Sequence, residues 1–565
     1  MAEAPAAPPH DGEHRVDLVV RGADVYTLDP DRPRASALAA RDGRVVALGT
    51  DWDIERLVGP NTRVVDAGGR MLMPGLVDVH THLGFGGRAA AWELVLPPMS
   101  GVTEILGCVR DQARALGPDE WVVGGTLIGP VFQAVGNPAM LAALDEVSEG
   151  RPVMLRDDSL HHRWVNSRAL EILGVGDATP DPPSGRYVRD SAGHAVGLLL
   201  GAPSTDAELA ARQAVADTHE QDLRSARTAV SILNSVGVTA TQDAATMGAW
   251  LEVFTELDRA DGLNAWVVGS LPAREFIEPG PVGPELFDSA PRLRSPHVRP
   301  DFVKAVLDGV PTTRTSKFLE PYRAVAGAGG PDEGGEDYAG ENLFTDGELL
   351  LLLEEAVARG LHAKLHATGD GTVRQVLDAV QRLRERHGDG PVFHLAHPEF
   401  VHPDDVARFR ELDVVADVSP ALWFPQPMNG IIAQQVRDHY MERIWPLREL
   451  HEAGSHIAAG SDWPVAAALP NPWLSIEAMV TRRNPDPTFP GELAPGQALD
   501  LTTAVGAHTV RAAEAIGLSH ETGRLKPGMS ADFIILDRPL FGIPVTEIHA
   551  TQVVQTWFAG RQVHC

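Results

Sequence analysis

The middle of the chain alternates short apolar runs with longer stretches in which apolar residues recur every three or four positions. The short runs are typical of buried strands and the longer stretches of amphipathic helices, so their alternation predicts an α/β fold with a parallel sheet. The predicted strands are residues 76–82, 238–244, 265–271, 302–308, 361–367, 392–397, 414–419 and 456–462, and clear helical stretches are 346–359, 372–386 and 403–412. Eight parallel strands can close into a barrel, so we predict a (β/α)8 TIM-like barrel over residues 71–522.

Both ends of the chain carry a different pattern. From residue 16 to about residue 70, short alternating or apolar runs are separated by Asp-Gly and Pro turns, and this pattern returns over residues 523–565. It predicts a small β-sandwich domain built from both chain ends, although separate terminal hairpins would give the same pattern. Residues 1–15 have neither a basic start nor an apolar stretch, which predicts a disordered tail and no signal peptide.

A long segment separates the first two predicted strands and exceeds an ordinary crossover. It contains its own strand-like runs at 121–127 and 152–158 and helical stretches at 102–115 and 206–236. We therefore predict an inserted subdomain over about residues 85–235, placed as a lid or wall at the barrel mouth. A Gly-rich segment at 326–337 predicts a surface loop of unassigned role.

Composition narrows the classes of partner. The 565 residues carry a formal net charge of −29, which argues against binding to nucleic acid or to an anionic membrane. The two cysteines, Cys108 and Cys565, make a disulfide framework improbable and fit a reducing compartment. No window is long and apolar enough for a membrane helix, so the expectation is a soluble, cytoplasmic protein that acts on a small molecule.

Two histidines give the first chemical signal. His80 and His82 lie two residues apart in the first predicted strand, PGLVDVHTH, and therefore project from the same face near its C-terminal end. Two imidazoles on one face suit a divalent metal. The alternative is a half-buried strand with hydrogen-bonded histidines.

Four further strands carry residues that suit metal chemistry. Lys304 lies in an apolar run, and His366, His397 and Asp462 each end a later strand. Functional groups of barrel enzymes collect at this C-terminal face, and the set matches the needs of a two-metal hydrolase. Lys304 could instead be a snorkelling lysine or pair with Asp308.

The order of these residues resembles the amidohydrolase superfamily. More narrowly, the chain resembles amidohydrolase family 3, the YtcJ-like branch that includes N-substituted formamide deformylases. The resemblance runs from about Val16 to His564 and rests on the motifs PGLVDVHTH, RWVNSRAL, HATGD, HPEFVHPDD, GSDWPV and GRLKPGMSADFIILDR.

The resemblance implies a ligand set. His80, His82 and Asp462 would bind the more buried metal, His366 and His397 the second, and a carboxylated Lys304 would bridge them. Two zinc ions are the default, although manganese, iron or cobalt would fit and a single-metal variant stays open.

Two nearby residues complicate the ligand assignment. His394 is close to His397, but it lies on the opposite face of the strand and farther from the rim, so His397 is preferred as the ligand. Lys364 departs from the family pattern, and it would either form an ion pair inside the barrel or perturb the second metal.

The same resemblance implies hydrolysis of an amide-like C–N bond in an N-acyl, N-formyl, carbamate or cyclic amide substrate. Water activated by the metals would attack the carbonyl carbon, with Asp462 as general base and then general acid. The alternatives are ester or lactone hydrolysis, decarboxylation or hydration on the same scaffold, and a non-catalytic binding relative. A homodimer is the assembly to test, because relatives of this kind commonly dimerise.

Five residues are candidates for substrate contact, and each has an alternative structural role. His161 aligns with a family histidine that could touch the substrate carbonyl, or it could be a surface loop residue. Arg314 could bind a polar group or hold its own loop. Trp423, Phe424 and Trp463 follow the last two strands, where they could form an apolar wall for an apolar or aromatic substituent or simply pack.

Overall fold

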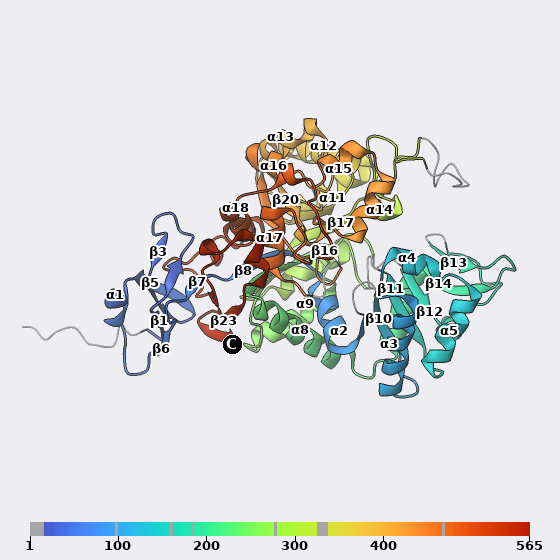
Figure 1. The fold of residues 1–565 in the computed structure, drawn as a ribbon, viewed down its shortest axis with the longest axis horizontal. Helices are drawn as coiled ribbons and strands as arrows, with labels where there is room; N and C mark the ends of the chain where they lie inside the picture. Colours follow the sequence, from blue (N-terminus) through green and yellow to red (C-terminus); the bar gives the residue numbers. More distant parts are fainter. Residues whose placement is uncertain are drawn as a thin grey trace, which may run out of the picture.

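An eight-stranded parallel sheet forms the centre of the molecule (Figure 1). The computed structural model describes residues 16–565 except 97–99, 158–161, 183–184, 276–279, 325–336 and 466–468. Neighbouring strands follow one another in sequence, in the order β8 (Leu76–Thr81), β15 (Val238–Asp243), β16 (Trp266–Pro272), β17 (Val298–Val306), β18 (His362–His366), β19 (Phe393–Ala396), β20 (Val414–Val418) and β21 (His456–Ala459). All eight predicted strands are confirmed.

The first and last strands approach each other and nearly close the barrel. Thr81 and Trp463 form a parallel bridge, the His82 amide donates to the Trp463 carbonyl at 2.8 Å, and the Asp462 amide donates to the His80 carbonyl at 2.7 Å. The bonds that join the strands therefore involve the same short segments that carry three of the predicted metal ligands.

The two faces of the barrel strands contribute to different buried clusters. Leu76, Val267 and Leu365 pack into the large cluster shared with the surrounding helices, while Val77 and Val268 pack into a smaller cluster with α19 (Val510–Ala515). Side chains two apart in a strand share a face, so the near-continuous apolar runs reflect burial on both sides. The surrounding helices include α9 (Gly248–Arg259), α11 (Asp346–Ala358), α12 (Asp370–His387), α13 (Pro403–Glu411) and α16 (Leu447–Glu452).

Strands from both ends of the chain pair with each other. One sheet has the order β24 (Arg561–His564), β23 (Val553–Phe558), β22 (Phe533–Leu536), β7 (Met71–Pro74), β2 (Asp24–Tyr26) and β3 (Arg34–Ala35). A four-stranded sheet beside it has the order β5 (Arg44–Gly49), β4 (Ala37–Arg41), β1 (Leu18–Arg21) and β6 (Arg63–Asp66). Leu18, Leu38, Leu72 and Phe533, drawn from both sheets, share one buried cluster. The predicted domain boundaries stay predictions.

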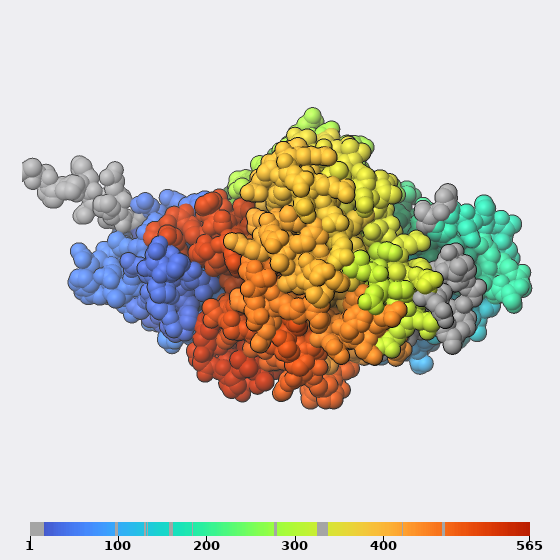
Figure 2. All heavy atoms as spheres, turned by 90° about the horizontal axis from the view of Figure 1, so that it is seen from above, coloured from blue at the N-terminus to red at the C-terminus, as the bar shows by residue number. Residues whose placement is uncertain are grey.

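Another six-stranded sheet lies between β8 and β15 in the sequence. Its order is β13 (Gly185–Arg189), β14 (Ala195–Gly201), β12 (His162–Val165), β11 (Val153–Asp157), β10 (Val122–Leu127) and β9 (Leu94–Val95), and the neighbouring helices include α3 (Val102–Ala115) and α5 (Pro138–Ser148). This sheet and the sheets of the chain ends lie at opposite ends of the long axis, with the barrel between them (Figure 1, Figure 2).

The helical stretch predicted at 206–236 is two helices. α7 (Ala202–Gln213) and α8 (Thr218–Ser235) are separated at Asp217, whose side chain caps α8 by accepting from the Glu220 amide. A side-chain oxygen at an N-cap satisfies a free helix N–H, which explains the break. α8 then packs along α2 (Leu83–Trp92), the helix that begins directly after His82.

Candidate metal centre

Three predicted ligands meet where β8 and β21 come together. The Nε2 atoms of His80 and His82 lie 3.5 Å and 3.4 Å from Oδ1 of Asp462. One ligand atom from each of the three residues lies within 4.8 Å of the others, and all three residues are buried. His80 is on β8, His82 is the N-cap of α2, and Asp462 follows β21.

The other two histidines extend this cluster toward β18 and β19. The His397 ring centroid is 4.5 Å from that of His80 and 5.0 Å from that of His366, and His397 Nε2 is 3.9 Å from Asp462 Oδ2. His366 Nε2 is 3.2 Å from the Gly309 carbonyl oxygen. This contact engages Nε2, so Nδ1 is the His366 atom available for a metal.

Two of these residues have an uncommon backbone conformation. His397 has φ of 61° and Asp462 has φ of 58°, in the left-handed region that non-glycine residues rarely adopt. Each follows the end of a barrel strand, and the left-handed turn redirects its side chain from the path the strand would give. Such positions collect at functional sites, where the surrounding structure holds them.

Lys304 lies on β17 and is 2% exposed. Burial, followed by the nearby Lys364, lowers the pKa of Lys304 to about 8. The suggested partner Asp308 is engaged elsewhere: it accepts the backbone N–H groups of Lys317, Thr368 and Gly369 at 3.0–3.1 Å. Lys304 is therefore a buried amine whose neutral form is accessible close to neutral pH.

The residues of the cluster fit a divalent metal. His80 Nε2 and Asp462 Oδ1 are both buried without a hydrogen-bond partner, yet they face each other at 3.5 Å. Ligands about 2.1 Å from a tetrahedral ion lie about 3.4 Å apart, which agrees with this separation. Burial, followed by Lys364, lowers the pKa of His80 to about 4, and burial, followed by Lys304, lowers that of His366 to about 3. Both imidazoles are therefore neutral at pH 7, the form that binds metals.

A buried polar cluster beside His80 consists of Asp417, Lys364 and His394, and of these residues the sequence had not indicated Asp417. Asp417 on β20 has its Oδ2 3.2 Å from His80 Nδ1 and also forms an ion pair with Lys364. Of the two roles considered for Lys364 from the sequence, the structure shows the ion pair inside the barrel. His394 lies nearby, with Nε2 3.0 Å from the Ala515 carbonyl and Nδ1 3.8 Å from Asp417. The signal that could have identified Asp417 is a lone carboxylate inside the apolar run VVADV.

Two further contacts fix the ligand segments. The Asp78 carboxylate accepts the amides of His80 and Ser461, both at 3.0 Å, and so joins β8 to the segment that carries Asp462. Ser419 Oγ lies 3.1 Å from His397 Nδ1, which leaves His397 Nε2 directed toward Asp462. Asp78 and Ser419, which are not predicted ligands, therefore hold the backbone of the His80 and Asp462 segments and the ring of His397.

Arg314 and Trp423, two of the predicted substrate residues, are engaged by other parts of the protein. Arg314 donates from Nη1 to the Arg323 carbonyl at 2.9 Å and to Gln435 Oε1 at 3.2 Å, so it joins its own loop to α14 (Pro427–Gln435). Trp423 is fully buried against Trp445, with ring centroids 5.2 Å apart.

Trp463 and Phe424, two further predicted substrate residues, are buried and partly buried. Trp463 is 2% exposed, and a Cβ at Gly86 would lie 2.4 Å from its ring. Phe424 is partly buried against the main core. His161 lies outside the described residues, as does most of the Gly-rich segment 326–337.

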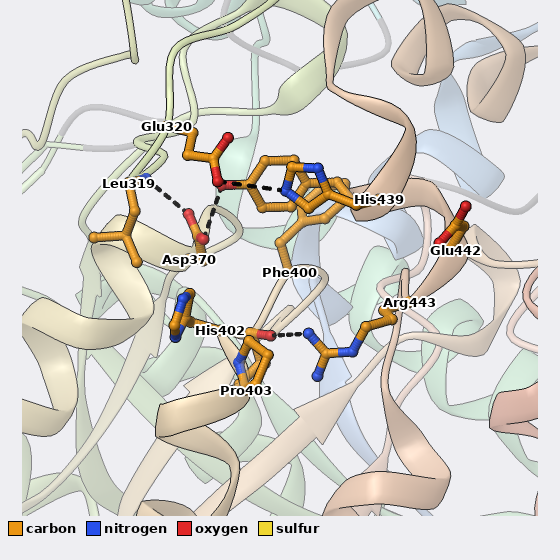
Figure 3. A pocket seen from close by; sticks show the side chains of 11 residues that line it. Leu319, Glu320, Asp370, Phe400, His402, Pro403, His439, Glu442 and Arg443 are labelled. Atoms are coloured by element: carbon orange, nitrogen blue, oxygen red, sulfur yellow. Dashed lines mark hydrogen bonds and ion pairs between the residues drawn. The ribbon is translucent and has the colours of Figure 1, made fainter.

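A separate hollow of about 360 Å³ lies beside α12 and α15 (Asp438–Glu442). Figure 3 shows Phe400 in its wall, with Glu320, Asp370 and His439 around it. Tyr440 also lines this hollow. Tyr440 donates to Asp370 at 2.9 Å. None of the predicted metal ligands lines this hollow.

The chain belongs to the amidohydrolase family, whose sequence profile matches residues 63–564. It is 26% identical to the N-substituted formamide deformylase of Arthrobacter pascens, over 96% of this chain and 97% of the relative. It is 24% identical to the putative amidohydrolase YtcJ of Bacillus subtilis, over 96% and 98% of the two chains.

Among solved structures, an uncharacterized metal-dependent hydrolase from Pyrococcus horikoshii shares the fold. The TM-score is 0.73 at 21% identity, with 94% of this chain and 99% of that chain covered. The predicted resemblance is confirmed, and the family supports a metal-dependent hydrolase. Across the described residues, no helix has the length and apolar character that crossing a membrane requires.

Proposed function

We propose that this protein hydrolyses an amide-like C–N bond at a two-metal centre, with N-formyl and N-acyl amines as the first substrates to test. The observation that carries the proposal is the buried triangle of His80, His82 and Asp462, whose facing atoms have the separation of metal ligands. The formamide deformylase named among the relatives supports the choice of bond.

The ligands divide into two groups. His80, His82 and Asp462 hold the first metal, His366 and His397 hold the second, and zinc is the first ion to test. A divalent metal at such a centre supplies a Lewis acid for the scissile carbonyl and lowers the pKa of water to about 7.

Lys304 supplies the bridge. Its neutral Nζ donates its lone pair to the carbon of carbon dioxide, and one proton leaves to solvent, so a carbamate anion forms. The buried position and the pKa of about 8 make the neutral amine accessible for this step. The resulting carboxylate oxygens would be hard ligands of the kind that divalent metals accept.

Asp462 divides its two oxygens between two tasks. Oδ1 faces His80 and His82, while Oδ2 lies on the side of His397. Oδ1 therefore acts as ligand, and Oδ2 takes the proton of the attacking water and returns it to the leaving nitrogen. An ionised carboxylate can accept the proton in the first transfer and, once protonated, can donate it in the second.

The test is a panel of N-substituted formamides, N-acyl amines, cyclic amides, esters and lactones, given to zinc- or manganese-loaded protein. We expect release of free amine from at least one amide class. Asp462→Asn, with its metal content measured alongside, should lower that rate by about 10²-fold or more. Hydrolysis of esters or lactones alone would overturn the choice of bond, and a rate unchanged in Asp462→Asn would overturn the role of Asp462.

A further inference from the structure

A buried ion pair lies beside His80 of the proposed metal centre. Lys364 on β18 and Asp417 on β20 are both 0% exposed, and the Lys364 ammonium contacts the Asp417 carboxylate. The same ammonium donates to the Val79 carbonyl at 2.8 Å, one residue before His80. Lys364 therefore connects three strands of the barrel at the level of the first metal ligand.

The Asp417 carboxylate contacts both Lys364 and His80. Oδ2 of Asp417, the oxygen that contacts Lys364, lies 3.2 Å from His80 Nδ1. On the other side of the same ring, Nε2 faces Asp462 at 3.5 Å. A carboxylate at one imidazole nitrogen fixes the N–H there and leaves the lone pair of the other nitrogen for the metal.

We propose that Lys364 is a positioning residue of the metal centre: it fixes the Asp417 carboxylate, which orients His80 and keeps its Nε2 lone pair directed at the metal. The inference rests on the proposed metal centre and goes beyond its ligand set. Its ammonium bonds to Asp417 and to the Val79 carbonyl, and Lys364 acts through these two groups.

A buried ion pair of this kind is weak evidence for a role in fold stability. Bringing both charges out of water costs free energy that their attraction often only offsets, and apolar residues of similar volume commonly stabilise a fold as well or better. A purely structural pair is therefore replaceable by two apolar side chains. A positioning pair is not, because apolar side chains cannot hold the N–H of His80.

This contrast defines the experiment. Zinc dissociation constants are measured by competition with a chelator for the parent, Lys364→Met, Asp417→Asn and the double variant Lys364→Met with Asp417→Leu. Thermal unfolding is recorded for each metal-free protein. Cobalt(II)-loaded samples report the ligand geometry by their visible absorption. Asp532→Asn is the matched control, because Asp532 is a buried carboxylate that accepts from Trp266 at the start of β16, away from the ligands.

We expect Lys364→Met and Asp417→Asn to weaken zinc binding by about 10- to 100-fold, the usual cost of losing such a partner. The double variant should unfold at a temperature equal to or above that of the single variants, yet keep the weakened zinc binding and an altered cobalt spectrum. The control should bind zinc within about threefold of the parent.

Two results would overturn the inference, and they separate it from the proposed function. If the double variant binds zinc as the parent does and has the parent's cobalt spectrum, the pair is structural. The proposed metal centre would not be affected by that result. A parent protein that binds no zinc or cobalt would overturn the metal centre and the inference together.

Discussion

Gly460 lies against His80 so closely that a Cβ at Gly460 would fall 2.4 Å from the His80 amide nitrogen and 2.6 Å from its Cβ. This contact lies where β21 meets β8, two residues before Asp462. Glycine at this position therefore permits the strand approach that brings Asp462 to the two histidines. The Gly-Ser-Asp segment is as much a requirement of barrel closure as of the site.

Gly460→Ala should therefore damage closure and site together. Overpacking at such a contact costs about 1–3 kcal/mol, and the shift of the ligand segments should weaken metal binding. Thermal unfolding and zinc titration measure the two effects. Gly347→Ala is the matched control, because nothing lies within 4 Å of its Cβ position on α11. Equal behaviour of the two variants would contradict the argument.

Metal loading should depend on carbon dioxide and on pH. Burial, followed by Lys364, lowers the pKa of Lys304 to about 8, so raising the pH from about 7 to about 9 increases the neutral amine from about one tenth to about nine tenths. Metal-depleted protein equilibrated with zinc and bicarbonate should regain metal more fully as pH rises through this range, because the carbamate fraction at a fixed bicarbonate concentration follows the neutral amine. Uptake that ignores bicarbonate at every pH would argue against the carbamate.

Arg314→Met should destabilise the loop that carries Arg314 without changing the metal content of the protein. The variant loses the two Nη1 bonds to the Arg323 carbonyl and Gln435, each worth about 1–3 kcal/mol when a charged donor is involved. We expect a lower unfolding temperature and unchanged metal content, measured by calorimetry and elemental analysis. A rise of KM at unchanged stability would instead assign Arg314 to substrate binding.

Local patterns of the sequence were sufficient for the barrel and for the ligand candidates. Strand periodicity and turn residues predicted all eight strands, because each strand is buried on both faces and ends at recognisable turn residues. The candidate ligands His80, His82, His366, His397 and Asp462 stood out because they lie at or near the ends of these runs. Parallel strands bring their C-terminal ends together, so proximity followed from topology.

Contacts between strands that are not neighbours could not be predicted from the sequence. The pairing of Lys364 with Asp417 joins β18 to β20 across β19, and it depends on the stagger of the barrel. The left-handed backbone of His397 and Asp462 is set by tertiary contacts at non-glycine residues. The division of 206–236 into two helices rests on the cap at Asp217, a signal weaker than the amphipathic pattern around it.

Metal content per chain, with Lys304→Ala beside the parent, tests the central claim most directly. Elemental analysis of protein purified without chelators should give close to two metals per chain, falling sharply in the variant because the bridge is lost. One metal that survives the substitution would contradict the carbamate-bridged centre and make Lys304 structural. No metal in the parent, even after loading with zinc or manganese, would contradict the account as a whole.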